Sequence, residues 1–126
     1  MNYENFEQIR KIFENQKKSR WQVAQTTARE RIQKLRILRK KLLERQNEFY
    51  EAIWKDVHKC KFEAWETEIF PTIEEFDCAI SHLKKWMKGK RGGWVFFLPT
   101  TCSRTKFEPK GQVLVMAPWN YPLHLF

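Results

Sequence analysis

The sequence predicts an α+β fold, with helices in its longer first part and short strands in its last third. Up to Met87, apolar residues recur every three to four positions, which is the period of helices with one apolar face. After the glycines of the stretch GKRGGW, alternating and proline-bounded apolar segments follow, and these are typical of strands.

The N-terminal stretch predicts a short helix, and the polar run 15–20 predicts a break after it. Its apolar residues lie at helical spacing: Phe6, Ile9, Ile12 and Phe13. A second helical region covers residues 32–57, and its apolar stripe changes phase near Gln46. That phase change predicts either a bend or two abutting helices.

A third helical region covers residues 65–87, and Pro71 lies inside it. Because proline lacks an N–H and clashes with the preceding turn, the helix is expected to kink or restart there. The acidic residues at 74, 75 and 77 favour a restart, since a helix N-terminus carries partial positive charge. The carboxylates of residues 63–77 are expected on the solvated face.

Three segments of the last third read as strands: Trp94–Leu98, Ser103–Glu108 and Gln112–Ala117. A turn at Pro99 would join the first two as a hairpin, and Pro109 with Gly111 would separate the third.

Composition bounds the class of protein. The 126 residues fit one domain, and the 42% hydrophobic content supports a core, so disorder is not expected. The net charge of +9 comes from basic excess at both ends, with an acidic excess in residues 59–82. A basic chain can bind nucleic acid, but the mixing of Lys and Arg with Glu and Gln favours solvated helix surfaces.

The cysteines predict a reduced, cytoplasmic protein. Cys60, Cys78 and Cys102 are odd in number, widely spaced and form no CxxC motif, which argues against a disulfide framework. The three histidines are His58, His82 and His124. Their spacing is not that of zinc ligands, so no metal site is predicted. No signal peptide is recognised, and the longest apolar runs are too short to span a bilayer.

The chemistry-bearing stretch is GQVLVMAPWNYPLHLF. Pro118 and Pro122 each restrict the residue before them, so Trp119, Asn120 and Tyr121 are expected in a stiff loop after a strand. The Asn120 amide has two N–H donors, which suits a developing oxyanion. On these residues alone, an ordinary turn is the favoured alternative.

Two blocks resemble a known family. The segment FEPKGQVLVMAPWNYPLHL resembles the part of aldehyde dehydrogenases that enters the cofactor domain, with its Glu-Pro-x-Gly, apolar strand and Pro-Trp-Asn-x-Pro. The upstream FYEAIWKDVHKCKFEAWETEI is similar to the N-terminal helices of the class 3-like branch. The resemblance covers the chain from about Phe6 onward.

The resemblance implies an N-terminal helical region at 1–88 and a β-hairpin of the bridging, oligomerisation region at 94–108. Residues 111–126 would be the truncated start of a Rossmann-like cofactor-binding domain within an α/β enzyme. The parent activity would be oxidation of an aldehyde to a carboxylic acid with NAD or NADP.

The resemblance also implies roles for the loop residues. Asn120 would stabilise the oxyanion, and Tyr121 would face the substrate channel. The residues that would line the nicotinamide cofactor are Ala117, Pro118 and Trp119.

The family's nucleophilic cysteine, general-base glutamate and glycine turn lie downstream of the matched region, and no cysteine of this chain matches the nucleophile. We therefore expect an N-terminal fragment that is inactive and poorly soluble alone, with exposed apolar patches. The parent enzyme is expected to be a cytoplasmic homodimer that does not bind nucleic acid. Two alternatives stay open: a stand-alone basic helical module that binds nucleic acid or an acidic protein, and a truncated product that regulates the full enzyme at its dimer interface.

Overall fold

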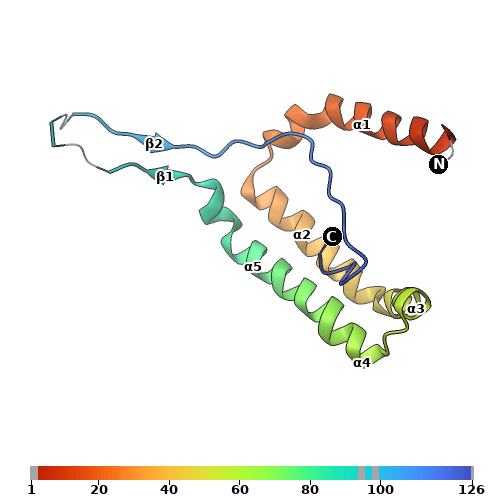
Figure 1. The fold of residues 1–126 in the computed structure, drawn as a ribbon. Coiled ribbons are helices and arrows are strands. Elements are labelled where there is room, and N and C mark those ends of the chain that lie inside the picture. The colour runs from red at the N-terminus through yellow and green to blue at the C-terminus, as the bar shows by residue number, and fades with distance from the viewer. Residues whose placement is uncertain (1–2, 94–95, 98–99, 126) are drawn as a thin grey trace. The chain divides into compact units, whose positions relative to one another are not determined.

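The protein is mostly helical and carries a small antiparallel sheet (Figure 1). The computed structural model describes residues 3–93, 96–97 and 100–125. The helices are α1 (Tyr3–Ala24), α2 (Ala28–Glu44), α3 (Gln46–Val57), α4 (Lys61–Ala64), the π-helical η1 (Trp65–Ile69) and α5 (Phe70–Met87). The strands are β1 (Lys90–Arg91) and β2 (Arg104–Thr105). This content agrees with the predicted α+β class, whereas the Rossmann-like domain from residue 111 stays a prediction.

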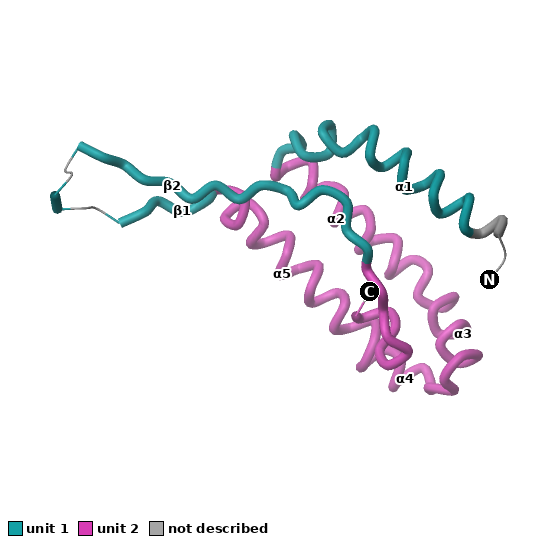
Figure 2. Tube along the Cα trace, turned by 45° about the horizontal axis from the view of Figure 1, so that its top comes forward, with its two compact units in different colours: residues 1–27, 89–114 teal, residues 28–88, 115–126 magenta. Residues whose placement is uncertain are grey.

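The chain forms two compact units, each built from two separate stretches of sequence (Figure 2). The first unit contains residues 1–27 and 89–114, and the second contains residues 28–88 and 115–126. The C-terminal loop of interest therefore belongs to the same unit as helices α2 to α5.

In the first unit, α1 runs without interruption through residues 15–20, so the predicted break is wrong. The polar run consists largely of Gln, Lys and Arg, which are good helix formers. The Ser19 hydroxyl also lies 3.2 Å from the Gln16 carbonyl oxygen, so its polar group is satisfied within the helix. Polarity alone was therefore a poor signal for a break.

The predicted helix end at the glycines is confirmed, because α5 ends at Met87 and Gly89 follows in a left-handed conformation with φ of 71°. Glycine adopts this conformation without steric cost, which is why it commonly follows a helix end. A Cβ at position 89 would also clash with the carbonyl oxygen of Thr105.

The structure confirms an antiparallel hairpin but corrects the residues that pair. Lys90 pairs with Thr105 and Arg91 with Arg104, and the Gly92 N–H donates to the Ser103 carbonyl at 2.9 Å.

Of the first predicted strand, Trp94–Leu98, only Phe96 and Phe97 are described, and they lie in a turn. Trp94, Val95 and Leu98 lie outside the described residues, and so does Pro99, where the joining turn was predicted. The second predicted strand, Ser103–Glu108, contributes only Arg104 and Thr105 to the ladder.

The predicted third strand, Gln112–Ala117, is also corrected, because no strand is formed there. A strand needs a neighbour to accept and donate its backbone hydrogen bonds, and none of the described segments pairs with this one. The Gln112 side chain instead donates to the Phe13 carbonyl at 2.7 Å.

In the second unit, α2 and α5 run antiparallel and pack together (Figure 1). The phase change near Gln46 is explained by a boundary, since α2 ends at Glu44 and α3 begins at Gln46. This outcome matches the abutting-helix alternative of the prediction. Arg45 between them forms a 2.5 Å ion pair with Glu48.

The kink or restart predicted at Pro71 corresponds to the start of a new α-helical segment, because α5 begins at Phe70 with Pro71 in its first turn. The acidic residues 74, 75 and 77, which were expected in that first turn, lie beyond it. The preceding residues form a wider π-helical turn, in which the Phe70 N–H donates to the Trp65 carbonyl five residues back. Since Pro71 cannot donate to the carbonyl four residues before it, a change of hydrogen-bond pattern falls at this point. The π turn sets which side chains of residues 65–69 face inward.

The core of this unit is a cluster of three buried residues, Leu42, Ile69 and Ile73. They come from α2, η1 and α5, so the cluster joins the antiparallel pair to the π turn. Partly buried side chains pack around it: Leu43, Phe49, Tyr50, Trp65, Phe76 and Leu123. Leu123 ties the C-terminal loop to this core.

Large apolar side chains are widely exposed in the described parts of the chain, as expected. The α1 stripe is at least half exposed: Phe6, Ile9, Ile12 and Phe13. The described helices include none with the length and apolar character to cross a lipid bilayer.

Candidate functional site

The candidate site is the loop that contains Asn120. Trp119 and Asn120 form a bend after the extended stretch, and both side chains are exposed, Trp119 to 95%. Among the described residues, no hydrogen bond engages the Asn120 amide. Its two N–H donors are therefore available to a ligand oxygen.

Tyr121, the next residue, has an uncommon backbone conformation with φ of 53°. For a residue with a side chain this left-handed conformation costs roughly 1–2 kcal/mol, so the surroundings must hold it in place. The Tyr121 carbonyl accepts a hydrogen bond from the Leu125 N–H at 3.0 Å, which closes one turn after it. Pro122 restricts the backbone inside this turn.

A buried carboxylate anchors the turn through two backbone hydrogen bonds. Glu68 is fully buried, and its Oε2 accepts the backbone N–H groups of Leu123 at 3.1 Å and His124 at 3.3 Å. Its Oε1 lies 2.8 Å from Lys59 Nζ. A carboxylate at such a depth needs charged and hydrogen-bonded partners, and Glu68 has both.

Lys59 links the carboxylate to the loop a second time. Its side chain is only 16% exposed, and its Nζ lies 4.5 Å from the centre of the Tyr121 ring. A cation over an aromatic face is attracted by the ring, more strongly where water is excluded. Lys59 thus contacts both the carboxylate and the residue with positive φ.

Sequence reasoning missed this anchor, because it assigned the carboxylates of residues 63–77 to a solvated face. That expectation is wrong for Glu68, although Glu63, Glu66, Glu74 and Glu75 are exposed. The available signal was position: Glu68 follows the buried Ala64 by four residues and directly precedes the buried Ile69. An acidic residue on an apolar stripe needs a partner, but the sequence could not identify which one.

The predicted cofactor residues lie at the end of the extended stretch before the bend. Ala117 is half-buried, whereas Pro118 and Trp119 are exposed. None of these three predicted cofactor residues has a polar partner among the described side chains. The Tyr121 ring lies against Lys59, and the Asn120 side chain is left exposed.

Resolved pKa shifts lie elsewhere in the same unit. A hydrogen bond from Lys41 lowers the pKa of Glu44, and one from Arg45 lowers the pKa of Glu48. Burial raises the pKa of Tyr50 beside the core. These groups belong to α2 and α3 and are not part of the Asn120 loop.

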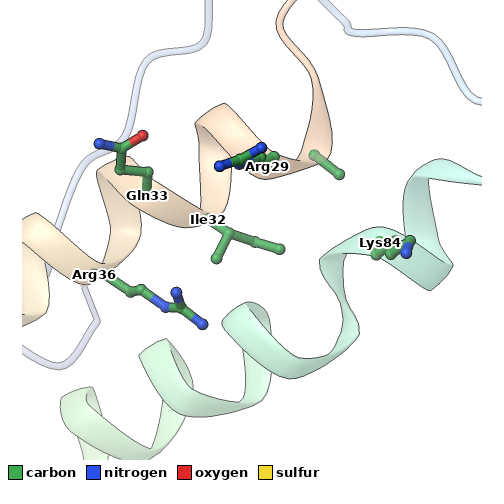
Figure 3. A pocket seen from close by; sticks show the side chains of 6 residues that line it. Arg29, Ile32, Gln33, Arg36 and Lys84 are labelled. Carbon is green, nitrogen blue, oxygen red and sulfur yellow. The ribbon is translucent and has the colours of Figure 1, made fainter.

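A groove of about 650 Å³ lies between α2 and the last turns of α5 (Figure 3). Its lining combines three basic residues with apolar and amide side chains: Ala28, Arg29, Ile32, Gln33, Arg36 and Lys84. Lys84 and Phe70 lie near opposite ends of α5, about 20 Å apart at the helical rise. The groove is therefore separate from the Glu68 anchor, and the predicted site residues do not line it.

The cysteines are free and exposed: Cys60, Cys78 and Cys102. Cys78 Sγ lies 3.8 Å from His82 Nδ1 on the adjacent turn of α5. Sequence reasoning set a Cys–His pair aside because the cysteines are scattered, although the spacing of four residues between Cys78 and His82 is visible in the sequence. The same nitrogen is closer to the Ser81 hydroxyl and the Cys78 carbonyl, each at 2.9 Å, so it mainly serves local contacts. In the parts of the chain that are described, no group of three His, Cys, Asp or Glu side chains could hold a metal ion.

Comparison with known proteins places the chain in context. Residues 1–126 match the profile of the aldehyde dehydrogenase family. Aldehyde dehydrogenase family 3 comG of Dictyostelium discoideum is 34% identical over 93% of the chain and 23% of its own length. The 4,4'-diaponeurosporen-aldehyde dehydrogenase of Staphylococcus aureus is 38% identical over 75% of the chain and 21% of its own length.

A mammalian member of family 3 shows a comparable level of identity. Aldehyde dehydrogenase family 3 member B1 of Mus musculus is 34% identical over 67% of the chain and 18% of its own length. The chain thus spans 18–23% of the length of these three relatives.

Proposed function

We propose that this chain supplies the oxyanion-binding amide of an aldehyde-oxidising enzyme. The premise is that the chain belongs to the aldehyde dehydrogenase family and is class 3-like. In this proposal, residues 1–126 are the N-terminal part of a longer polypeptide, which we call the complete enzyme. The complete enzyme would convert an aldehyde to a carboxylic acid with NAD or NADP.

The exposed Asn120 amide is the observation that carries the proposal. When a thiolate adds to an aldehyde, the carbonyl oxygen gains negative charge, and a preorganised neutral donor stabilises it. Asn120 is open to such an oxygen, and the residues after it are held by Pro122 and the Glu68 anchor. A donor held in advance does not have to reorganise as the charge develops.

Ala117, Pro118 and Trp119 are proposed to contact the nicotinamide cofactor. The exposed Trp119 side chain and the extended backbone before it fit a planar ring ligand, because aromatic and backbone surface is open there. When bound, this cofactor accepts a hydride from the substrate. Tyr121 is proposed to border the substrate channel on the other side of Asn120.

The family's nucleophile and general base have no counterpart in residues 1–126, so the 126-residue chain by itself is proposed to be inactive. The complete enzyme is proposed to be a cytoplasmic homodimer. Light scattering of the purified enzyme measures the mass, and a monomer at micromolar concentration would exclude the dimer.

The test of function is an NAD(P)H absorbance assay on the complete enzyme with a medium-chain aldehyde. Asn120→Ala is expected to lower kcat by about 10²–10³-fold, the usual loss for one oxyanion donor. Asn47→Ala, which truncates an exposed asparagine of α3, is the matched control and should leave kcat unchanged. Equal kcat values for wild type and Asn120→Ala would refute the role of Asn120, and turnover by residues 1–126 alone would refute their inactivity.

A second candidate function is binding of nucleic acid or an acidic protein by the basic helices. The net charge of +9 and the basic groove between α2 and α5 favour it. This function predicts DNA or RNA binding that weakens steeply with salt. Binding that is absent at low salt would remove it.

A further inference from the structure

Glu68 is an unusual residue because it is a fully buried carboxylate whose two oxygens have partners in two different parts of the unit. Oε1 contacts Lys59, which precedes α4, and Oε2 contacts backbone N–H groups in the C-terminal turn. The carboxylate therefore connects the π turn to the turn Tyr121–Leu125, which follows Asn120.

The connection to Asn120 is short. Only Tyr121 and Pro122 separate Asn120 from the first anchored N–H group, that of Leu123. Pro122 has a restricted φ, and Tyr121 is held in its left-handed conformation with its ring against Lys59. Few freely rotating bonds thus remain between the buried carboxylate and the Asn120 backbone.

The location of Glu68 on η1 explains how the anchor is held still. Ile69, the adjacent residue, is also fully buried and belongs to the core cluster with Leu42 and Ile73. The π turn therefore directs two consecutive side chains inward, one to the core and one to the loop. A displacement of the loop would have to move the carboxylate against this core.

We propose that Glu68 is a positioning residue for Asn120: with Lys59, it holds the turn after Asn120 so that the amide meets the oxyanion. This inference rests on the proposed oxyanion role of Asn120, and it adds a residue that does not itself contact the substrate. A catalytic donor gains from such support, because small displacements of reacting groups lower rates strongly.

The test is a kinetic double-mutant cycle in the complete enzyme with Glu68→Gln and Asn120→Ala. Glu68→Gln keeps the side-chain shape but removes the charge that pairs with Lys59. We expect kcat to fall about tenfold, with a smaller change in the KM for aldehyde. In the Asn120→Ala background, Glu68→Gln should have no further effect on kcat, because the positioned group is already gone.

Glu66→Gln is the matched control, because it makes the same chemical change on the same π turn at an exposed residue. It should match wild type in kcat and KM. The inference is overturned if Glu68→Gln also matches wild type, or if it lowers kcat by the same factor with and without Asn120. The second result would show an effect that does not pass through Asn120.

If Glu68→Gln does not fold, Lys59→Met replaces it in the cycle. This variant keeps an apolar stem and leaves the backbone hydrogen bonds of Glu68 in place. A kcat loss that disappears in the Asn120→Ala background supports the inference, and a loss that persists there overturns it.

Hydrogen exchange separates this inference from the proposed function. In wild-type complete enzyme the Leu123 and His124 amides should be protected, and Glu68→Gln should speed their exchange about fivefold while Glu66→Gln does not. Equal exchange in all three proteins would show that Glu68 does not hold the loop, whatever the activity. Absence of aldehyde oxidation in wild type, with the exchange difference present, would refute the enzyme function and leave the anchor standing.

Discussion

Two neighbouring segments of the C-terminal chain, the turn Tyr121–Leu125 and the extended stretch 113–119, are held in opposite ways. The turn is anchored by Glu68, contacts Lys59 through Tyr121 and places Leu123 against the core. In the extended stretch, apolar side chains are exposed, with Leu114 at 80% and Met116 at 81%, and no ladder supports the backbone.

This contrast shows that apolar content does not decide which segment is held. The extended stretch is the more apolar of the two, yet it lacks a described neighbour to bury it or to pair with its backbone. The turn has such neighbours, because a carboxylate on η1 accepts two of its N–H groups. Buried polar groups select one arrangement, since any other leaves them without partners.

Removal of the Glu68 anchor should have the largest effect on the free energy of unfolding. Glu68→Ala is expected to lower the free energy of unfolding by about 4 kcal/mol, because it leaves Lys59 and two backbone N–H groups without their partner. Urea denaturation followed by tryptophan fluorescence measures the change. Glu66→Ala is the control, and equal losses for both variants would contradict a specific anchor.

A cavity in the core beneath the turn should cost slightly less. Ile69→Ala is expected to lower the free energy of unfolding by about 3 kcal/mol, since Ile69 is fully buried among the cluster residues. The same denaturation experiment measures it, with Phe62→Ala at a 73% exposed position as the comparison. A loss below that of Phe62→Ala would mean that the cluster is not a core.

The backbone of the turn gives a smaller and sharper test. Tyr121→Gly and Tyr121→Ala both remove the ring contact with Lys59, but only glycine adopts positive φ without steric cost. The glycine variant should therefore be more stable than the alanine variant by about 1 kcal/mol. Thermal unfolding of the two variants compares them, and a more stable alanine variant would show that φ is not positive there.

The extended stretch should be the least sensitive. Met116→Ala is expected to change the free energy of unfolding by less than about 0.5 kcal/mol, because the side chain is exposed and packs against little. A loss of 2 kcal/mol or more, on the order of a core truncation, would mean that a surface covers Met116 in solution. That result would remove the contrast between the two segments.

Much of the helical region could be predicted from the sequence. The apolar period located α2, α3 and α5. The phase change at Gln46 located the boundary between α2 and α3, and Pro71 located the start of α5. These signals are local, so a window of the sequence contains them. The break in α1 failed because polar residues with good helix propensity do not end a helix.

The strands were harder to predict, since pairing is not a local property. Alternation at 112–117 suggested a strand, but a ladder needs a second strand in register. The hairpin was predicted with the wrong pairs for the same reason, since the sequence does not state which residues face each other.

The sequence by itself determined most of the helical region, the position of Asn120 between two prolines and the family resemblance, because periodicity, prolines and motifs are written along the chain. Only the tertiary structure decided that Glu68 is buried beneath that loop with Lys59. Its partners at Leu123 and His124 lie 55 and 56 residues away, so no local pattern could reveal them. Burial makes the partnership matter, because a carboxylate without water must find its hydrogen bonds and countercharge within the fold.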